Sequence, residues 1–279
     1  MKRALALMLL ACALLAVPGC GEQKRGYAIA AGPEGLAAAR MLGEKLAGGA
    51  VARAAGSKAA LQQLAMGSCE FAVVTEAQLR DAVTGGGEFL GDSYLDLQRI
   101  DSMLLGVFLP VSKAKTLEEM AFLRGRVACI GQKGDGAFAL AEALCLELAL
   151  DEPLEVSAEE ALRGFESGEW AAVAGLFLPG DETISRLAEL DGNALDISSF
   201  AEGLSLPPSM ALSNAPELFE GMDALRAPLF YGALVCDQSL PQADRKKAAA
   251  VLVGLPIRSQ QMPSYIVPEE TPLTTAMAG

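Results

Sequence analysis

The segment "RVACIGQKGDGAFALAEALCLELAL" (126–150) decides the fold class of this chain. A short apolar strand runs into a turn with three glycines, and a stretch with helical periodicity follows, which we expect to begin at Ala137. The first N–H groups of a helix lack partners within the helix and carry a partial positive charge. Such a turn suits a carboxylate, phosphate or sulfate. A tight strand–helix turn without any ligand uses the same residues, so the motif alone leaves both interpretations open.

The glycine spacing of this turn excludes two nucleotide-binding motifs. The order is G-x-x-G-x-G rather than G-x-G-x-x-G, and no Gly-Lys-Ser/Thr closes the turn. Asp135 lies in the turn and would repel an anion unless it is protonated or points away.

Strands and helices alternate along the chain on both sides of this segment. An unbroken apolar run at 102–112 indicates a sheet that is covered on both faces. Three helices are expected to begin with capping-box spacing, at Thr75, Thr116 and Ser157. The alternation predicts an α/β fold, and the proline-rich stretch 205–228 is expected to cross between two series. The expected strands are 26–31, 50–55, 70–75, 102–112, 126–130, 154–157, 171–178, 194–198 and 229–237.

Four strand ends face helix starts, at 31–36, 55–58, 74–76 and 130–137. Ligands of open α/β sheets bind beyond the carboxyl ends of the strands. A hydroxyl at a helix start is most often only an N-cap, but two α/β halves that present such turns to each other would clamp a small anion. The predicted ligand-binding residues are Gly35, Gly56, Ser57, Lys58, Thr75, Gly134, Asp135 and Gly136.

The N-terminal residues have the form of an export signal. Lys2 and Arg3 precede an apolar stretch that is too short for a membrane span, and "VPGC" ends at Cys20. We interpret 1–19 as a lipoprotein signal peptide, Cys20 as the lipidated residue that anchors the chain to a membrane, and 20–25 as a tether. A plain secretory signal is the alternative.

Charge and composition exclude several classes of function. Removing Lys2 and Arg3 from the 22 basic residues leaves 20 against 35 acidic ones, which argues against nucleic acid as a partner. The 279 residues include no histidine, which excludes Ser-His-Asp and Cys-His catalysis and His-ligated metals, so neither an enzyme nor a metal or cofactor is expected. Cys129 and Cys145 could form a disulfide in an exported protein, or they are buried free thiols.

The order of these motifs resembles the TAXI-type solute receptors of TRAP transporters, within the type II periplasmic solute-binding proteins. The matching segments are "AIAAGPEG", "AAGSKAALQQLAMGSCEFAVV", the stretch from "TLEEMAFLRG" to Leu150, and "SAEEALRGFESGEWAAVAGLFLPG". They cover most of 26–180, and the similarity is fainter over 229–255. The Gly-Ser-Gly-Thr of that family is Gly-Asp-Gly-Ala at 134–137, so two hydroxyls are lost and a carboxyl is gained.

The resemblance implies a two-lobe α/β fold with an interlobe cleft, lobe I being 26–110 plus 229–279 and lobe II 111–228. It implies a lipid-anchored periplasmic protein that closes about a hinge on a small organic acid or amino acid and delivers it to a TRAP-type membrane permease. A zwitterion would place its carboxylate on Ser57 and Lys58 and its ammonium near Asp135, Glu34 or Glu76. The alternative is a degenerate relative of the same fold that acts as a sensor or scaffold without transport.

Overall fold

The computed structural model describes residues 26–257, apart from 47, 91–93, 95, 124, 205, 207–208 and 219–224. The predicted signal peptide 1–19, the lipidation site Cys20 and the tether 20–25 lie outside the described residues, as does the chain after 257. Among the described residues, no helix is both long and apolar enough to span a bilayer.

The described chain forms two successive α/β series and a returning strand. The first series contains β1 (Ala28–Ala31), η1 (Pro33–Gly35), α2 (Leu36–Lys45), β2 (Ala50–Arg53), α3 (Ser57–Ala65), β3 (Phe71–Thr75), α4 (Glu76–Thr84), η2 (Gly87–Phe89) and β4 (Leu97–Ser112). The second contains α5 (Leu117–Phe122), β5 (Arg126–Ile130), α6 (Gly136–Glu147), β6 (Leu154–Glu155), α7 (Ala158–Ser167), β7 (Trp170–Phe177), α8 (Glu182–Glu189), β8 (Asn193–Ala194), α9 (Ser198–Glu202) and β9 (Met210–Asn214). The chain then returns to the first series in strand β10 (Arg226–Asp237), and helix α10 (Gln242–Val253) follows.

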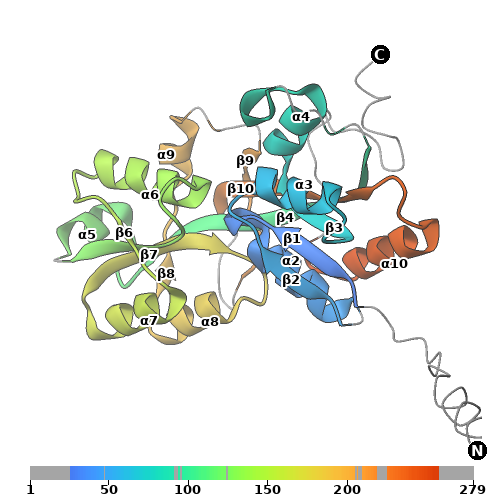
Figure 1. Cartoon of the computed structure of the whole chain (residues 1–279). Coiled ribbons are helices and arrows are strands. Elements are labelled where there is room, and N and C mark those ends of the chain that lie inside the picture. The colour runs from blue at the N-terminus through green and yellow to red at the C-terminus, as the bar shows by residue number, and fades with distance from the viewer. Residues whose placement is uncertain are drawn as a thin grey trace, which may run out of the picture.

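The strands join in the order β2-β1-β3-β10-β4-β7-β5-β6, with β8 beside β4 and β9 beside β10. Strands β1, β2 and β3 are parallel, and so are β5, β6 and β7. Helices cover both faces of each group: α3 and α4 lie opposite α2 and α10, and α6 lies opposite α7 and α8 (Figure 1). The α/β fold predicted from the sequence is confirmed.

The two long strands at the centre make the two parallel groups point toward each other. β10 is antiparallel to β3 and to β4, and β4 is antiparallel to β7. Strand β3 ends at Thr75, opposite Gly232, which also pairs with Met103 of β4, whereas β7 ends at Phe177, opposite Val107. The carboxyl ends of both parallel groups therefore meet at the middle of β4.

The predicted lobe boundaries, 26–110 plus 229–279 and 111–228, stay a prediction. Strand β4 continues past Pro110 to Ser112 and pairs with β7 on both sides of residue 110. The strand pairing is thus continuous from one series into the other, and it marks no break at this position.

Three segments differ from the sequence expectation. β4 begins at Leu97 instead of residue 102, because its polar residues are buried with polar partners rather than exposed. The strand expected at 194–198 is reduced to β8, and a short helix, α9, begins at Ser198. The proline-rich stretch contains a strand that periodicity did not predict, β9, which pairs along the first half of β10.

A buried ion pair ties the start of α4 to β4. Arg99 Nη2 lies 2.6 Å from Glu76 Oε2, and Arg99 Nη1 donates to Ser102 Oγ at 2.8 Å. The two charged side chains are 3% and 7% exposed. Glu76 Oε1 and Arg99 Nε are buried without a hydrogen-bond partner. The charges are therefore compensated by each other and only partly by hydrogen bonds.

Removing one member of this pair should destabilise the fold strongly. Arg99→Met leaves the Glu76 carboxylate buried without its counter-charge, at an expected cost of about 3–5 kcal/mol in the free energy of unfolding. Arg99→Met/Glu76→Leu should cost less than Arg99→Met alone, because no charge is left unpaired. Urea unfolding followed by the fluorescence of Trp170, the single tryptophan, measures both values.

The control is Arg226→Met, which breaks the exposed pair between Arg226 and Glu202 and should cost under about 1 kcal/mol. If Arg99→Met costs no more than this control, the buried pair does not hold α4 on β4.

Candidate functional site

A cavity of about 750 Å³ lies where the two groups of strand ends meet. Its floor includes Leu105, from the middle of β4. One wall is built from the first series: Pro33, Glu34, Leu36, Ala37, Arg40 and Arg53. The other is built from the second: Ile130, Gly131, Gln132, Asp135, Ala137, Glu155, Val156, Ser157, Ala158, Glu160, Leu176, Asp181 and Thr183. We call these the first wall and the second wall.

The first wall carries two arginines. Arg53 is the last residue of β2, and Arg40 lies on α2. Both side chains are exposed, and neither has a hydrogen bond or ion pair with another described residue. Both guanidinium groups are therefore available to an anionic group in the cavity.

The second wall carries carboxylates that are held by backbone N–H groups. Glu155 Oε2 accepts from Lys133 N at 3.0 Å, and Asp181 Oδ1 accepts from Thr183 N at 2.7 Å. Glu160 Oε2 accepts from Ser157 N at 2.9 Å, and this hydrogen bond lowers the pKa of the Glu160 carboxyl. Apart from Glu34, whose carboxyl group reaches the second wall, the cavity therefore has positive charge on its first wall and negative charge on its second.

The N-terminus of α6 lies on the second wall, and side chains of this protein satisfy it. Asp135 caps the helix: its Oδ1 accepts from Phe138 N at 2.8 Å, and its Oδ2 accepts from Gln132 N at 2.6 Å. Glu34 reaches across from the first wall, and its Oε1 accepts from Gly136 N at 3.0 Å. The helix thus binds two carboxylates, one of them from a residue 102 positions away.

Burial raises the pKa of both carboxyls. For Glu34 the loss of solvent is the largest cause, and the hydrogen bond from Gly136 N acts against it. The pKa of Asp135 is also raised by burial, while the N–H groups of Phe138, Gln132 and Ala137 counteract the rise.

Asp135 lines the cavity, and so does Glu34, which the sequence predicts near an ammonium group. Glu76, which the sequence also predicts there, does not line it and pairs with Arg99.

Gly134 and Gly136 flank Asp135 in the same turn, so the structure brings the second-series candidates together. Gly136 is packed tightly: a Cβ there would lie 2.6 Å from Phe230 Cε1 and 2.8 Å from Met210 Cε.

The first-series candidates have structural contacts outside the cavity lining. Ser57 is buried, and its Oγ accepts from Thr75 N at 3.3 Å. Thr75 is the N-cap of α4, because its Oγ1 accepts from Gln78 N at 3.3 Å. Gly35 is buried against Val73, and the backbone of Gly56 packs on Gly32.

Lys58 is directed toward η2. Its Nζ donates to the carbonyl of Glu88 and lies 5.5 Å from the centre of the Phe89 ring. None of the first-series candidates lines the cavity that the structure describes, so their role in ligand binding stays a prediction.

The sequence analysis did not predict most of the charged residues that line the cavity. The strand-end argument, applied equally to every strand, would have found the last residues of β2 and β6, which are Arg53 and Glu155, and Asp181 after β7. Arg40 gave no local signal, because an arginine on a helix is ordinarily a solvated residue.

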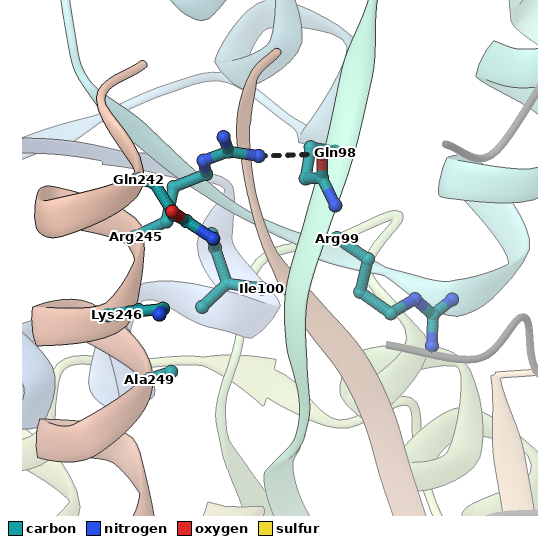
Figure 2. A pocket seen from close by; sticks show the side chains of 7 residues that line it. All are labelled: Gln98, Arg99, Ile100, Gln242, Arg245, Lys246 and Ala249. Atoms are coloured by element: carbon teal, nitrogen blue, oxygen red, sulfur yellow. Dashed lines mark hydrogen bonds between the residues drawn. The ribbon is translucent and has the colours of Figure 1, made fainter. Parts of the chain in front are cut away.

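A second cavity, of about 190 Å³, lies between α10 and β4 (Figure 2). Arg245 Nη1 donates to Gln98 Oε1 at 2.8 Å, while the side chain of Arg99 points away from α10 (Figure 2). This cavity is smaller than usual for a small-molecule site and lies away from the meeting strand ends. It is the weaker candidate.

Metal and thiol chemistry have no visible site in the described residues. They contain no group of three or more metal-ligating side chains. Cys69, Cys129, Cys145 and Cys236 are free and buried, and burial raises the pKa of the Cys129 thiol to about 12. Of the two alternatives for Cys129 and Cys145, the structure has the free thiols.

No known family model and no curated protein sequence matches this chain. Among solved structures, it is similar to a TctC solute-binding protein from Polaromonas, at 12% identity over 81% of this chain and 82% of that one, with a TM-score of 0.43. The aliphatic sulphonate binding protein SsuA from Escherichia coli shares 14% identity over 81% and 70%, with a TM-score of 0.36. A mutant form of the regulatory domain of HypT from Salmonella typhimurium shares 13% over 82% and 97%, with a TM-score of 0.46. Because a fold does not determine a function, the function has to be argued from the cavity.

The raised pKa of Glu34 predicts a pH-dependent contribution to stability. A carboxyl with a raised pKa in the folded state binds its proton more tightly there, so its contribution is full below the ordinary value of 4.5 and is lost as the pH rises through the folded value. The unfolding free energy of the wild type, minus that of Glu34→Gln, should therefore increase as the pH falls from 7 toward 4.5. Urea unfolding at several pH values measures this difference.

Glu160→Gln supplies a control of opposite sign. The pKa of Glu160 is lowered, so the contribution of this carboxyl is present above 4.5 and is lost as the pH falls through its folded value. A Glu34→Gln difference that stays constant between about pH 4 and 7 would contradict the first expectation.

Proposed function

We propose that this protein is an extracytoplasmic solute-binding protein that captures a small organic acid or amino acid in the cavity between its two walls. The observation that carries the proposal is a cavity at the converging strand ends, with free guanidinium groups on one side and anchored carboxylates on the other. Its volume lies within the usual range for small-molecule sites, about 300–1,000 Å³.

The charges on the walls favour an amino acid over a simple organic acid. In this proposal the carboxylate of the solute binds Arg40 and Arg53, since guanidinium groups form bidentate hydrogen bonds with carboxylates. An ammonium group fits opposite, beside Glu155 or Asp181. This orientation agrees with the zwitterion predicted from the sequence, but the proposed residues differ from the predicted ones for the carboxylate and for the ammonium group.

Closure on the solute would change the angle between the two proposed lobes, 26–110 plus 229–279 and 111–228. The proposed hinges are the two crossings that the sequence predicts between these lobes, at 109–113 and within 207–228. The TRAP-type permease as the partner rests on the resemblance to TAXI-type receptors. The sequence contains no histidine for Ser-His-Asp or Cys-His catalysis, so an enzyme of these classes is not proposed.

A sensor or scaffold without transport is the second candidate. The observation in its favour is that α6 already binds Glu34 and Asp135, so the helix end that could receive a solute is occupied from within.

Solute binding should be visible as thermal stabilisation. A solute at a hundredfold excess over its Kd stabilises the folded state by about 2.7 kcal/mol, so a screen of amino acids and small carboxylates by thermal shift should find at least one that raises Tm. Arg53→Ala should then weaken that solute by about 1.5–3 kcal/mol in calorimetry, because it removes a charged hydrogen-bond donor.

Lys45→Ala is the matched control, since Lys45 lies on α2 with Arg40 but does not line the cavity. Lys58→Ala in the same assay tests the contact that the sequence predicts at the start of α3. If no solute in the screen raises Tm, the sensor or scaffold is the better account, and if Arg53→Ala binds as Lys45→Ala does, the solute lies elsewhere.

The lipid anchor is a separate proposal that rests on the sequence of the export signal. Cys20→Ser removes the thiol that would carry the lipid, so the protein should move from the membrane fraction to the soluble exported fraction. Cell fractionation followed by immunoblotting measures this distribution. If the variant stays in the membrane fraction, the anchor is a peptide segment.

A further inference from the structure

Glu34 binds the start of α6, a position that the glycine-rich turn by itself makes suitable for an anion. Its Oε1 accepts from Gly136 N, the first N–H of a 12-residue helix, at 3.0 Å. Glu34 itself belongs to η1, on the opposite wall of the cavity. The contact therefore bridges the two walls through a charged hydrogen bond.

The remaining N–H groups of this turn leave little for a solute. Asp135 takes those of Gln132 and Phe138. The side chains of Phe230 and Met210 pack against Gly136, so its backbone has no room to move toward them. A solute that reaches this part of the second wall consequently meets two carboxylates instead of free donors.

The rest of the second wall reinforces this effect. Its charged residues Glu155, Glu160 and Asp181 are all acidic, whereas both arginines belong to the first wall. A second anionic group on a solute would have to displace Glu34 from Gly136 and remain close to these carboxylates, which like-charge repulsion disfavours.

We propose that Glu34 sets the charge selectivity of the cavity by acting as a built-in substitute for an anionic ligand group on α6. A solute with one anionic group binds with that group at Arg40 and Arg53 and presents a cationic or uncharged group to the second wall. A solute with anionic groups at both ends is excluded. This inference rests on the proposed function, because it specifies the ligand class of the same cavity.

Succinate is the probe that tests the inference, because it has a carboxylate at each end. Calorimetry should show weak binding of succinate to the wild type and at least about tenfold tighter binding to Glu34→Ala, which frees Gly136 N and removes one negative charge. Glu34→Ser, which is also too short to reach Gly136, replaces Glu34→Ala if that variant does not fold. Glycine, with a single carboxylate and an ammonium group, should gain less than about threefold from either substitution.

Glu44→Ala is the matched control, since Glu44 lies on α2, the helix that follows η1, but does not line the cavity. It should change succinate binding less than about threefold. If Glu34→Ala gains nothing, or if Glu44→Ala gains as much, Glu34 does not set the selectivity.

The same measurements separate this inference from the proposed function. A wild type that binds a dicarboxylate tightly, with Glu34 in place, overturns the inference and leaves solute binding intact. A wild type that binds none of the screened solutes, together with a Glu34→Ala variant that gains succinate, supports the role of Glu34 and overturns solute capture.

Discussion

The antiparallel pairing of β4 with β10 is the constraint on which the rest of the structure depends. Because β4 is also antiparallel to β7, the parallel strands of the two series run toward each other and end at the middle of β4. The strands approach closely there: a Cβ on Gly232 would lie 2.4 Å from the carbonyl oxygen of Val74, and one on Gly106 would lie 2.8 Å from Leu176 Cβ. The position of the cavity follows from this register rather than from any loop.

The contacts that the cavity offers depend on which groups accept hydrogen bonds from the N–H groups at the helix N-termini. α4, α7 and α8 are capped by their own Thr75, Ser157 and Asp181, and α6 is capped by Asp135 and reached by Glu34. Since these helix starts have partners within the chain, the proposed solute would be recognised mainly by side chains. That shifts the expected contacts from backbone turns to the arginines of one wall and the carboxylates of the other.

Sequence periodicity predicted the α/β alternation, since each buried strand and amphipathic helix has a local pattern. It placed the start of β4 too late, because Arg99 and Asp101 look solvent-exposed in a linear sequence although both are buried. Periodicity did not predict β9, because the prolines at 207–208 indicated a connecting segment between the two series. The partner of β9 is the first half of β10, and nothing near β9 in the sequence indicates that pairing.

The sequence by itself determined what depends on neighbouring residues: the strand-to-helix turns and the caps at Thr75 and Ser157, whose partners lie three positions away. Only the tertiary structure decided which turns share a cavity. Lys58 is directed to the carbonyl of Glu88, and Glu34 binds Gly136 although 102 residues separate them. The direction of a charged side chain is set by partners that the folded sheet brings close, and local spacing contains no information about those partners.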